Sequence, residues 1–121
     1  MWNFRKVDAW NRALDLSKVV YDLTRGFPSA EKYGLTSQLR RAVISISSNI
    51  AEGCGRRTSR DFISFMHNAI GSLKEVESEL FVAEKLGYVE IVHVEKLIEE
   101  LEETGRMISG MIQKEKERDV R

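Results

Sequence analysis

The sequence is poor in proline and cysteine, and its charges cancel. Its 121 residues include one proline, Pro28, and one cysteine, Cys54. A single cysteine excludes a disulfide within the chain and fits a reducing compartment. No apolar run is long enough to cross a bilayer, and the first ten residues lack a secretory apolar core. We therefore expect a cytoplasmic protein with no membrane partner. The 19 basic and 19 acidic residues give a net charge of zero, so the overall charge of the chain indicates no partner.

Strand signals are also missing, because neither sustained period-two alternation nor an Asn-Gly or Asp-Gly hairpin occurs. Helical periodicity is present instead, in segments at about residues 8–25, 33–55, 59–86 and 91–117. The connections between these segments are short, which makes neighbouring helices antiparallel. Residues 1–121 are therefore expected to form a single all-α domain, an up-down-up-down four-helix bundle.

The ends of these helices are predicted from capping residues. Asp8 is expected to cap the first helix, which ends at residues 26–28, where Phe27 can fold back onto the core. Thr58 or Ser59 is expected to cap the third helix, since both side chains can accept a bond from a backbone N–H of the first turn.

Each helical segment carries an apolar stripe at spacings of three and four, which keeps its side chains on one face. The stripes of the second and third helices are Leu35, Leu39, Ala42, Val43, Ile46, Ile50 and Gly53, and Phe62, Met66, Ala69, Leu73, Val76, Leu80 and Ala83. Several apolar residues fall outside the stripes, and a monomeric bundle offers them no second core. We expect them at a subunit interface. They are Ile44, Ile63, Phe65, Ile70 and Phe81.

A polar seam accompanies the stripe of the second helix. It consists of Gln38, Arg41, Ser45, Ser48, Asn49 and Glu52. Serine and asparagine lower helix propensity in the middle of a helix. Their presence is explained either by contacts with another helix or chain, or by a solvated flank whose small residues let a neighbour pack closely.

The segments YGLTSQLRRA, SNIAEG and GRR lie in and just after this second helix. AWNRALDL precedes them, and FISFMHNAIGSLKEVESEL and LGY follow. Together they resemble the four-helix-bundle family of proteins encoded in intervening sequences of bacterial large-subunit ribosomal RNA. The accessory variability determinants of diversity-generating retroelements are more distant relatives. The resemblance covers nearly the whole chain and implies a bacterial bundle that assembles as a ring, usually a pentamer.

Within the matching segments, four residues of the polar seam are expected to form a structural motif. They are Gln38, Arg41, Asn49 and Glu52. One position departs from the family. The family commonly has SIPSNIAEG, and Ser47 stands where that proline would be. Because serine retains the backbone N–H that proline lacks, we expect the helix to continue through Ser47 without a break.

The charges are neutral in sum but uneven in place. Residues 34–60 carry five basic and one acidic side chain, whereas residues 74–103 carry three basic and ten acidic ones. In an up-down bundle the chain start, the second turn and the chain end share one end, which we call the basic pole. Its cations are Arg5, Lys6, Arg56, Arg57, Arg60, Lys114, Lys116, Arg118 and Arg121.

The basic pole is predicted to contact nucleic-acid phosphates, either RNA or DNA, with little base readout. No aromatic residue interleaves the cluster in the sequence, so stacking on single strands is not predicted. Ordinary solubilising charge is the alternative explanation of these residues. A protein scaffold is the alternative function, in which the ring or its acidic helix faces bind a partner such as a nucleic-acid-handling enzyme.

Catalytic chemistry has little support in the sequence. Glu90 and His93 have the Glu-x-x-His spacing of di-iron bundles, but a second pair and further carboxylates are missing. No histidine is expected beside Cys54, which we interpret as a packing residue or a loop thiol. No nucleotide-binding glycine loop or zinc spacing occurs. We therefore expect a non-enzymatic protein without cofactor or metal, and a metal-dependent enzyme is the most distant alternative.

Overall fold

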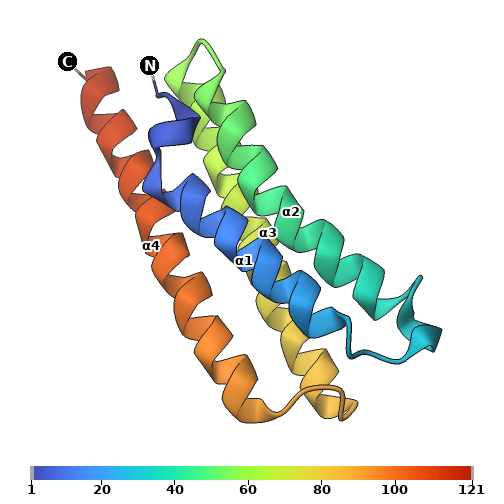
Figure 1. The fold of residues 1–121 in the computed structure, drawn as a ribbon. Coiled ribbons are helices and arrows are strands. Elements are labelled where there is room, and N and C mark those ends of the chain that lie inside the picture. The colour runs from blue at the N-terminus through green and yellow to red at the C-terminus, as the bar shows by residue number, and fades with distance from the viewer. Residues whose placement is uncertain (1, 121) are drawn as a thin grey trace.

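The computed structural model describes residues 2–120, which contain four α-helices and no strand. The helices are α1 (Asp8–Thr24), α2 (Leu35–Cys54), α3 (Ser59–Lys85) and α4 (Ile91–Val120). Two short 3-10 helices accompany them: η1 (Phe4–Lys6) precedes α1, and η2 (Ser29–Glu31) lies in the turn between α1 and α2. Successive helices run in opposite directions (Figure 1), which confirms the antiparallel four-helix bundle. Within residues 2–120, no helix is long and apolar enough to span a membrane.

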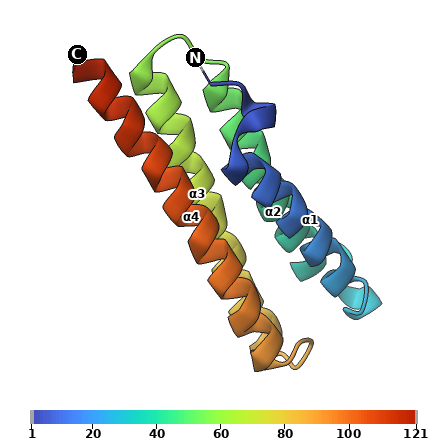
Figure 2. The same cartoon turned by 60° about the vertical axis from the view of Figure 1, so that its left-hand side comes forward.

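Each helix packs against two neighbours, so the bundle is a closed square. α2 and α3 share the most extensive contact, and α1 and α4 share the least. The η1 segment, the turn between α2 and α3, and the end of α4 lie at the same end of the bundle (Figures 1 and 2). The α1–α2 and α3–α4 turns lie at the opposite end. The up-down topology thus creates the common pole that the sequence predicted.

The predicted stripes form the core. Every stripe residue of α2 and α3 is buried. In α1 and α4 the predicted inward-facing residues are buried except for Leu23 and Ile98, which are half-buried. These residues are Ala13, Leu16, Val20 and Leu23, and Val94, Leu97, Ile98, Leu101, Ile108, Met111 and Ile112. Phe27 folds back onto the core as expected, and its ring lies 5.4 Å from that of Tyr88. The buried hydroxyls of Thr24, Ser47 and Thr104 donate to carbonyls of their own helices. Burial therefore leaves these three polar groups satisfied.

The predicted cap of α3 is confirmed, whereas the start of α1 and the end of α4 differ from the predictions. The hydroxyl oxygen of Thr58 accepts the N–H of Asp61 at 3.1 Å and caps α3. At α1 the expected cap is wrong, because Val7 occupies the N-cap position and Asp8 is the first helical residue. Val7 is buried in the core, and the chain enters α1 through this apolar contact. α4 also extends beyond the predicted end at residue 117, since neither glycine nor proline follows to stop it.

A close approach of α2 and α3 near the basic pole requires Gly53. A Cβ atom at this position would lie 2.6 Å from Met66 Cε and 2.9 Å from Phe65 Cβ. α2 is continuous through Ser47, as expected, and the Ser47 hydroxyl donates to the Ile44 carbonyl at 3.0 Å. The unbroken helix and the missing side chain let α2 lie against α3 along its length.

The polar seam of α2 has two roles along the same helix. The hydroxyl oxygens of Ser45 and Ser72 lie 2.8 Å apart and link α2 to α3. The Asn49 amide donates to the Ser45 carbonyl at 2.8 Å and to its hydroxyl at 3.0 Å. The remaining seam residues are exposed, namely Gln38, Arg41, Ser48 and Glu52. Both alternatives that the sequence left open are therefore realised, each at different residues.

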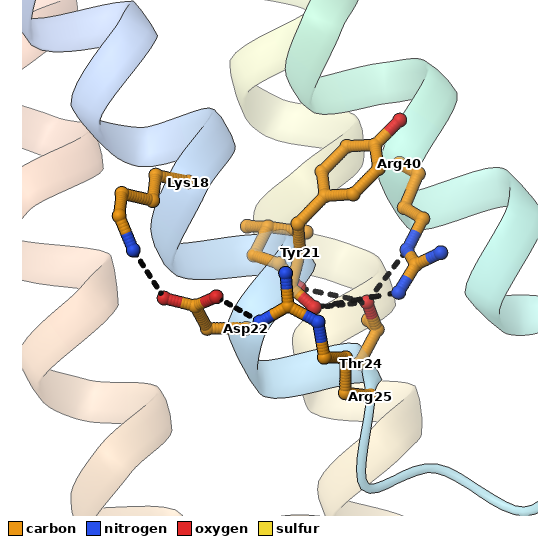
Figure 3. Close-up of polar contacts among 7 residues, drawn as sticks. Lys18, Tyr21, Asp22, Thr24, Arg25 and Arg40 are labelled. Atoms are coloured by element: carbon orange, nitrogen blue, oxygen red, sulfur yellow. Dashed lines mark hydrogen bonds and ion pairs between the residues drawn. The ribbon is translucent and has the colours of Figure 1, made fainter.

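Arg40 joins α2 to the last turn of α1 (Figure 3). Its Nε donates to the Thr24 hydroxyl at 2.9 Å, and its Nη2 donates to the Tyr21 carbonyl at 3.3 Å. The guanidinium carbon lies 4.5 Å from the centroid of the Tyr21 ring. Carbonyls at a helix C-terminus lack partners within the helix, so a cation there is stabilising. Next to this contact Asp22 pairs with Lys18 and Arg25, and its pKa is lowered first by the hydrogen bond from Lys18.

Replacing Arg40 with alanine is expected to lower the free energy of unfolding by about 1–2 kcal/mol, because it removes two charged hydrogen bonds between helices. Arg41→Ala is the matched control, since Arg41 is exposed on the same helix. It should change stability by less than about 0.5 kcal/mol. Urea unfolding followed by circular dichroism measures both. Equal losses in the two variants would contradict the role of Arg40.

Glu79 is a poorly solvated carboxylate on α3. One of its carboxylate oxygens is buried without a hydrogen-bond partner among the described residues. Burial, and secondarily the charge of Glu75, raises the pKa of Glu79 from 4.5 to about 7. Between these two pH values the folded chain retains a proton that the unfolded chain has released. Stability therefore falls as the pH rises from 4.5 through 7.

The variant Glu79→Gln removes this titration while preserving the shape of the side chain. At pH 8 it should be more stable than the parent protein by about 1 kcal/mol, a value reduced for partial exposure. At pH 4.5 the two proteins should be nearly equal. Urea unfolding at both pH values tests this, with the exposed Glu95→Gln as the control. A Glu79→Gln variant that is less stable at pH 8 would refute the assignment.

Candidate nucleic-acid interface

Arginines from two segments surround a small hollow at the basic pole. Arg56 and Arg57 lie in the turn between α2 and α3, and Arg118 lies near the end of α4. The hollow has a volume of about 100 Å³ and is referred to below as the basic hollow. Its lining consists of Trp2, Arg56, Arg57, Thr58, Phe62, Glu115 and Arg118. The guanidinium carbon of Arg56 lies 4.5 Å from the centroid of the Phe65 ring, which holds this arginine over α3.

Trp2 fastens the start of the chain to α3 and α4. Its indole ring stacks on Phe62, with centroids 5.6 Å apart and planes 7° from parallel. Its Nε1 donates to Glu115 Oε1 at 3.0 Å. The other oxygen of Glu115 accepts from the Ser59 hydroxyl at 2.6 Å. One carboxylate on α4 therefore joins the chain start, the beginning of α3 and the end of α4.

Glu115 is the one acidic side chain in the lining of the basic hollow. Its Oε1 lies 3.3 Å from Arg118 Nη1. Its pKa is lowered, first by the hydrogen bond from Ser59 and then by that from Trp2, against the opposing effect of burial. Glu115 is therefore ionised at neutral pH and offsets part of the positive charge of the three arginines.

A larger groove lies between the start of the chain and α4. Its volume is about 720 Å³, and we call it the α1–α4 groove. It is lined by Trp2, Asn3, Lys6, Val7, Asp8, Ala9, Met107, Gly110, Met111, Gln113, Lys114 and Glu117. Trp2 lines this groove as well as the basic hollow, so the two depressions are neighbours.

The structure divides the predicted cations into three groups. Arg56, Arg57 and Arg118 meet at the basic hollow, whereas Lys6 and Lys114 meet at the α1–α4 groove. The others are exposed at the same pole and line neither depression, namely Arg5, Arg60 and Lys116. Arg121 lies outside the described residues.

Sequence reasoning missed the aromatic component of this pole. Trp2 lies between the two depressions, and Phe65 lies under Arg56. The order of residues along the chain did not predict that these aromatic side chains lie beside the cations in space. The available signal was the topology itself, because an aromatic residue at the chain start must lie at the pole that holds the second turn.

The predicted interface residues are unequally exposed. Ile44 and Phe81 are 42% and 47% exposed. Ile63, Phe65 and Ile70 are half-buried and pack against the core of their own bundle. Within one protomer, Ile44 and Phe81 are therefore the members of this set with most surface left for another subunit, and the role of the set in assembly stays a prediction.

The residues considered for chemistry lie apart. Cys54 is the last residue of α2 and is 3% exposed. Burial raises the pKa of its thiol to about 11, so the sulfur is protonated at neutral pH and packs as an apolar group. Of the two interpretations of Cys54, the packing residue is therefore correct and the loop thiol is not. Glu90 and His93 are exposed near the start of α4, and no group of three potential metal ligands occurs among residues 2–120.

The fold and the side chains at the basic pole define the class of this protein, an antiparallel four-helix bundle with arginines at one end. The chain belongs to the family of 23S rRNA-intervening sequence proteins, whose model matches residues 5–110. A crystal structure of a protein of unknown function from the S23 ribosomal protein family of Bacteroides thetaiotaomicron is similar in fold. It has a TM-score of 0.76 and 19% sequence identity, over 86% of this chain and 97% of that one. No curated protein matches the sequence.

Proposed function

We propose that this protein is a non-enzymatic homo-oligomer, with a pentameric ring favoured, that binds nucleic-acid phosphates at the basic pole. The supporting observation is the meeting of Arg56, Arg57 and Arg118 around one hollow, from segments far apart in the chain. Each guanidinium presents a planar fork that can donate to two phosphate oxygens at once. Glu115 is the one acidic side chain of the lining, and it bonds to Ser59, Trp2 and Arg118, so three guanidinium groups face a single carboxylate. The arginines therefore retain net positive charge toward a ligand.

One protomer offers only a few phosphate contacts, so its affinity alone would be low. A ring repeats the basic pole around an axis and multiplies these contacts when one strand reaches several poles. The exposed side chains of Ile44 and Phe81 support association, because apolar groups of this size are more stable when buried. Binding of this kind depends on phosphate spacing and should show little sequence preference.

A protein scaffold is the second candidate, and the opposite end of the bundle favours it. Large exposed apolar side chains gather near the α1–α2 and α3–α4 turns. Apart from Phe81, which is assigned above to the subunit interface, they are Tyr33, Val82, Leu86, Ile91 and Val92. Tyr33 alone is 89% exposed. A partner such as a nucleic-acid-handling enzyme could bury these groups while the basic pole remains free, so the two functions are compatible.

The double variant Arg56→Glu/Arg57→Glu is expected to abolish nucleic-acid binding without unfolding the bundle, because both residues are exposed in a turn. The parent protein should bind duplex DNA and structured RNA, with a log–log salt slope of about −0.9 for each duplex phosphate neutralised. Fluorescence anisotropy at two salt concentrations measures the affinity and the slope.

The control is Lys85→Glu/Lys96→Glu, which changes the net charge equally with exposed residues of α3 and α4 away from the basic pole. It should reduce binding far less than the Arg56/Arg57 change. If the parent protein binds nothing at low salt, or if both double variants lose binding equally, the nucleic-acid function is wrong and the scaffold function takes its place.

Light scattering on a sizing column is expected to give a mass of several protomers, with five favoured, for the 13.9 kDa chain. Replacing Ile44 and Phe81 with aspartate should shift this mass toward the protomer, because each change places a charge in a buried contact. The same changes at Leu14 and Val19, which are exposed on α1, serve as the control. A parent protein that stays monomeric at all concentrations would exclude the ring.

A further inference from the structure

The surface of the α1–α4 groove is mainly apolar, and two exposed lysines also line it. Trp2, Val7, Ala9, Met107 and Met111 supply apolar surface, and Lys6 and Lys114 supply positive charge. Asp8 and Glu117 also line it, so the groove by itself carries no net charge. The adjoining basic hollow adds three arginines against Glu115. The two neighbouring depressions together therefore present excess positive charge beside an apolar cleft.

Trp2 presents a fixed indole ring between these depressions. Phe62 covers one face in a nearly parallel stack, and the bond from Nε1 to Glu115 sets the rotation of the ring. The side chain is nonetheless only half-buried, and it contributes to the lining of both depressions. The orientation of the Trp2 indole is therefore already fixed in the unbound protein. This lowers the entropic cost of stacking another flat group on it.

We propose that the α1–α4 groove is a binding site for an unpaired nucleobase, whose flanking phosphates bind the cations on either side of Trp2. This site rests on the nucleic-acid function proposed above and adds to it a preference for single-stranded or looped-out segments. A single strand alternates flat apolar rings with phosphates, and this pattern matches a cleft bordered by lysines and arginines. The bases of an intact duplex are paired and stacked, so they cannot enter the groove.

The polar residues of the groove complete the match to a base. Asn3 and Gln113 line it, and each side-chain amide can both donate and accept hydrogen bonds at a base edge. The volume of about 720 Å³ lies in the range of sites that hold small organic groups. A peptide helix would bury the same apolar surface but would supply no phosphates to pair with the neighbouring arginines. The charge distribution therefore favours a nucleic-acid strand.

Two helical glycines provide a matched pair of variants. Gly110 lines the groove, and a Cβ atom there would meet nothing within 4 Å. Gly71 on α3 has equally open surroundings and lines none of the depressions described here. Leucine at either position adds the same apolar volume and the same gain in helix propensity. Gly110→Leu places that volume in the groove, and Gly71→Leu places it elsewhere on the surface.

The experiment compares three fluorescein-labelled probes by anisotropy: an oligodeoxyadenylate, an abasic strand of equal length and a duplex. Base stacking predicts that the parent protein binds oligodeoxyadenylate about fivefold to a hundredfold more tightly than the abasic strand. Gly110→Leu should remove this preference while leaving abasic and duplex binding unchanged. Gly71→Leu should retain it.

Tryptophan fluorescence supplies a direct second measurement. The chain has two tryptophans, so Trp10→Phe leaves Trp2 as the only indole. Oligodeoxyadenylate should quench Trp2 emission, and the abasic strand should not. The base site is refuted if the parent protein binds both strands equally or if Gly110→Leu keeps the preference. It is also refuted if Gly110→Leu changes only the oligomer mass, which would assign the groove to a second copy of the chain.

These outcomes separate the base site from the proposed function. Duplex and abasic binding that depends on Arg56 and Arg57, without a preference for bases, overturns the groove site alone. An absence of binding to all three probes at low salt overturns both.

Discussion

The close packing of α2 against α3 is the constraint on which the arrangement of this protein depends. Gly53 lets the two backbones approach, and the Ser45–Ser72 contact links the helices further along. The antiparallel pair then needs a tight turn, and that turn carries Arg56 and Arg57. α1 and α4 pack against this pair, and the η1 segment and the end of α4 lie at the same pole (Figure 2).

The two ends of the bundle are held by different chemistry. At the basic pole, Glu115 accepts hydrogen bonds from Trp2 and Ser59, so one half-buried carboxylate organises an otherwise cationic surface. At the other end, Arg40 closes the α1–α2 turn through Thr24 and the Tyr21 carbonyl. A charge bonded to several neutral donors or acceptors is strongly held, which makes each contact an anchor for a terminal segment.

Several residues of the matching segments hold the bundle together. Gly53 permits the α2–α3 approach, Asn49 bonds to Ser45, and Arg40 holds α1. Arg41, beside Arg40, is exposed and is free to contact another molecule. Gln38 and Glu52 are exposed as well. A motif that is long and specific in sequence can thus identify a fold while leaving its ligand open, because only some of its members have a partner within the bundle.

Helical periodicity determined the four helices, their apolar stripes and the antiparallel order from the sequence alone, because these follow from local spacing and short connections. The same order placed Arg56 and Arg118 at one end. Only the tertiary structure decided that Trp2 lies among them, that Glu115 is bonded there and that Glu79 is poorly solvated. Those facts depend on contacts between segments far apart in the chain, and no local pattern records which side chains meet across a bundle.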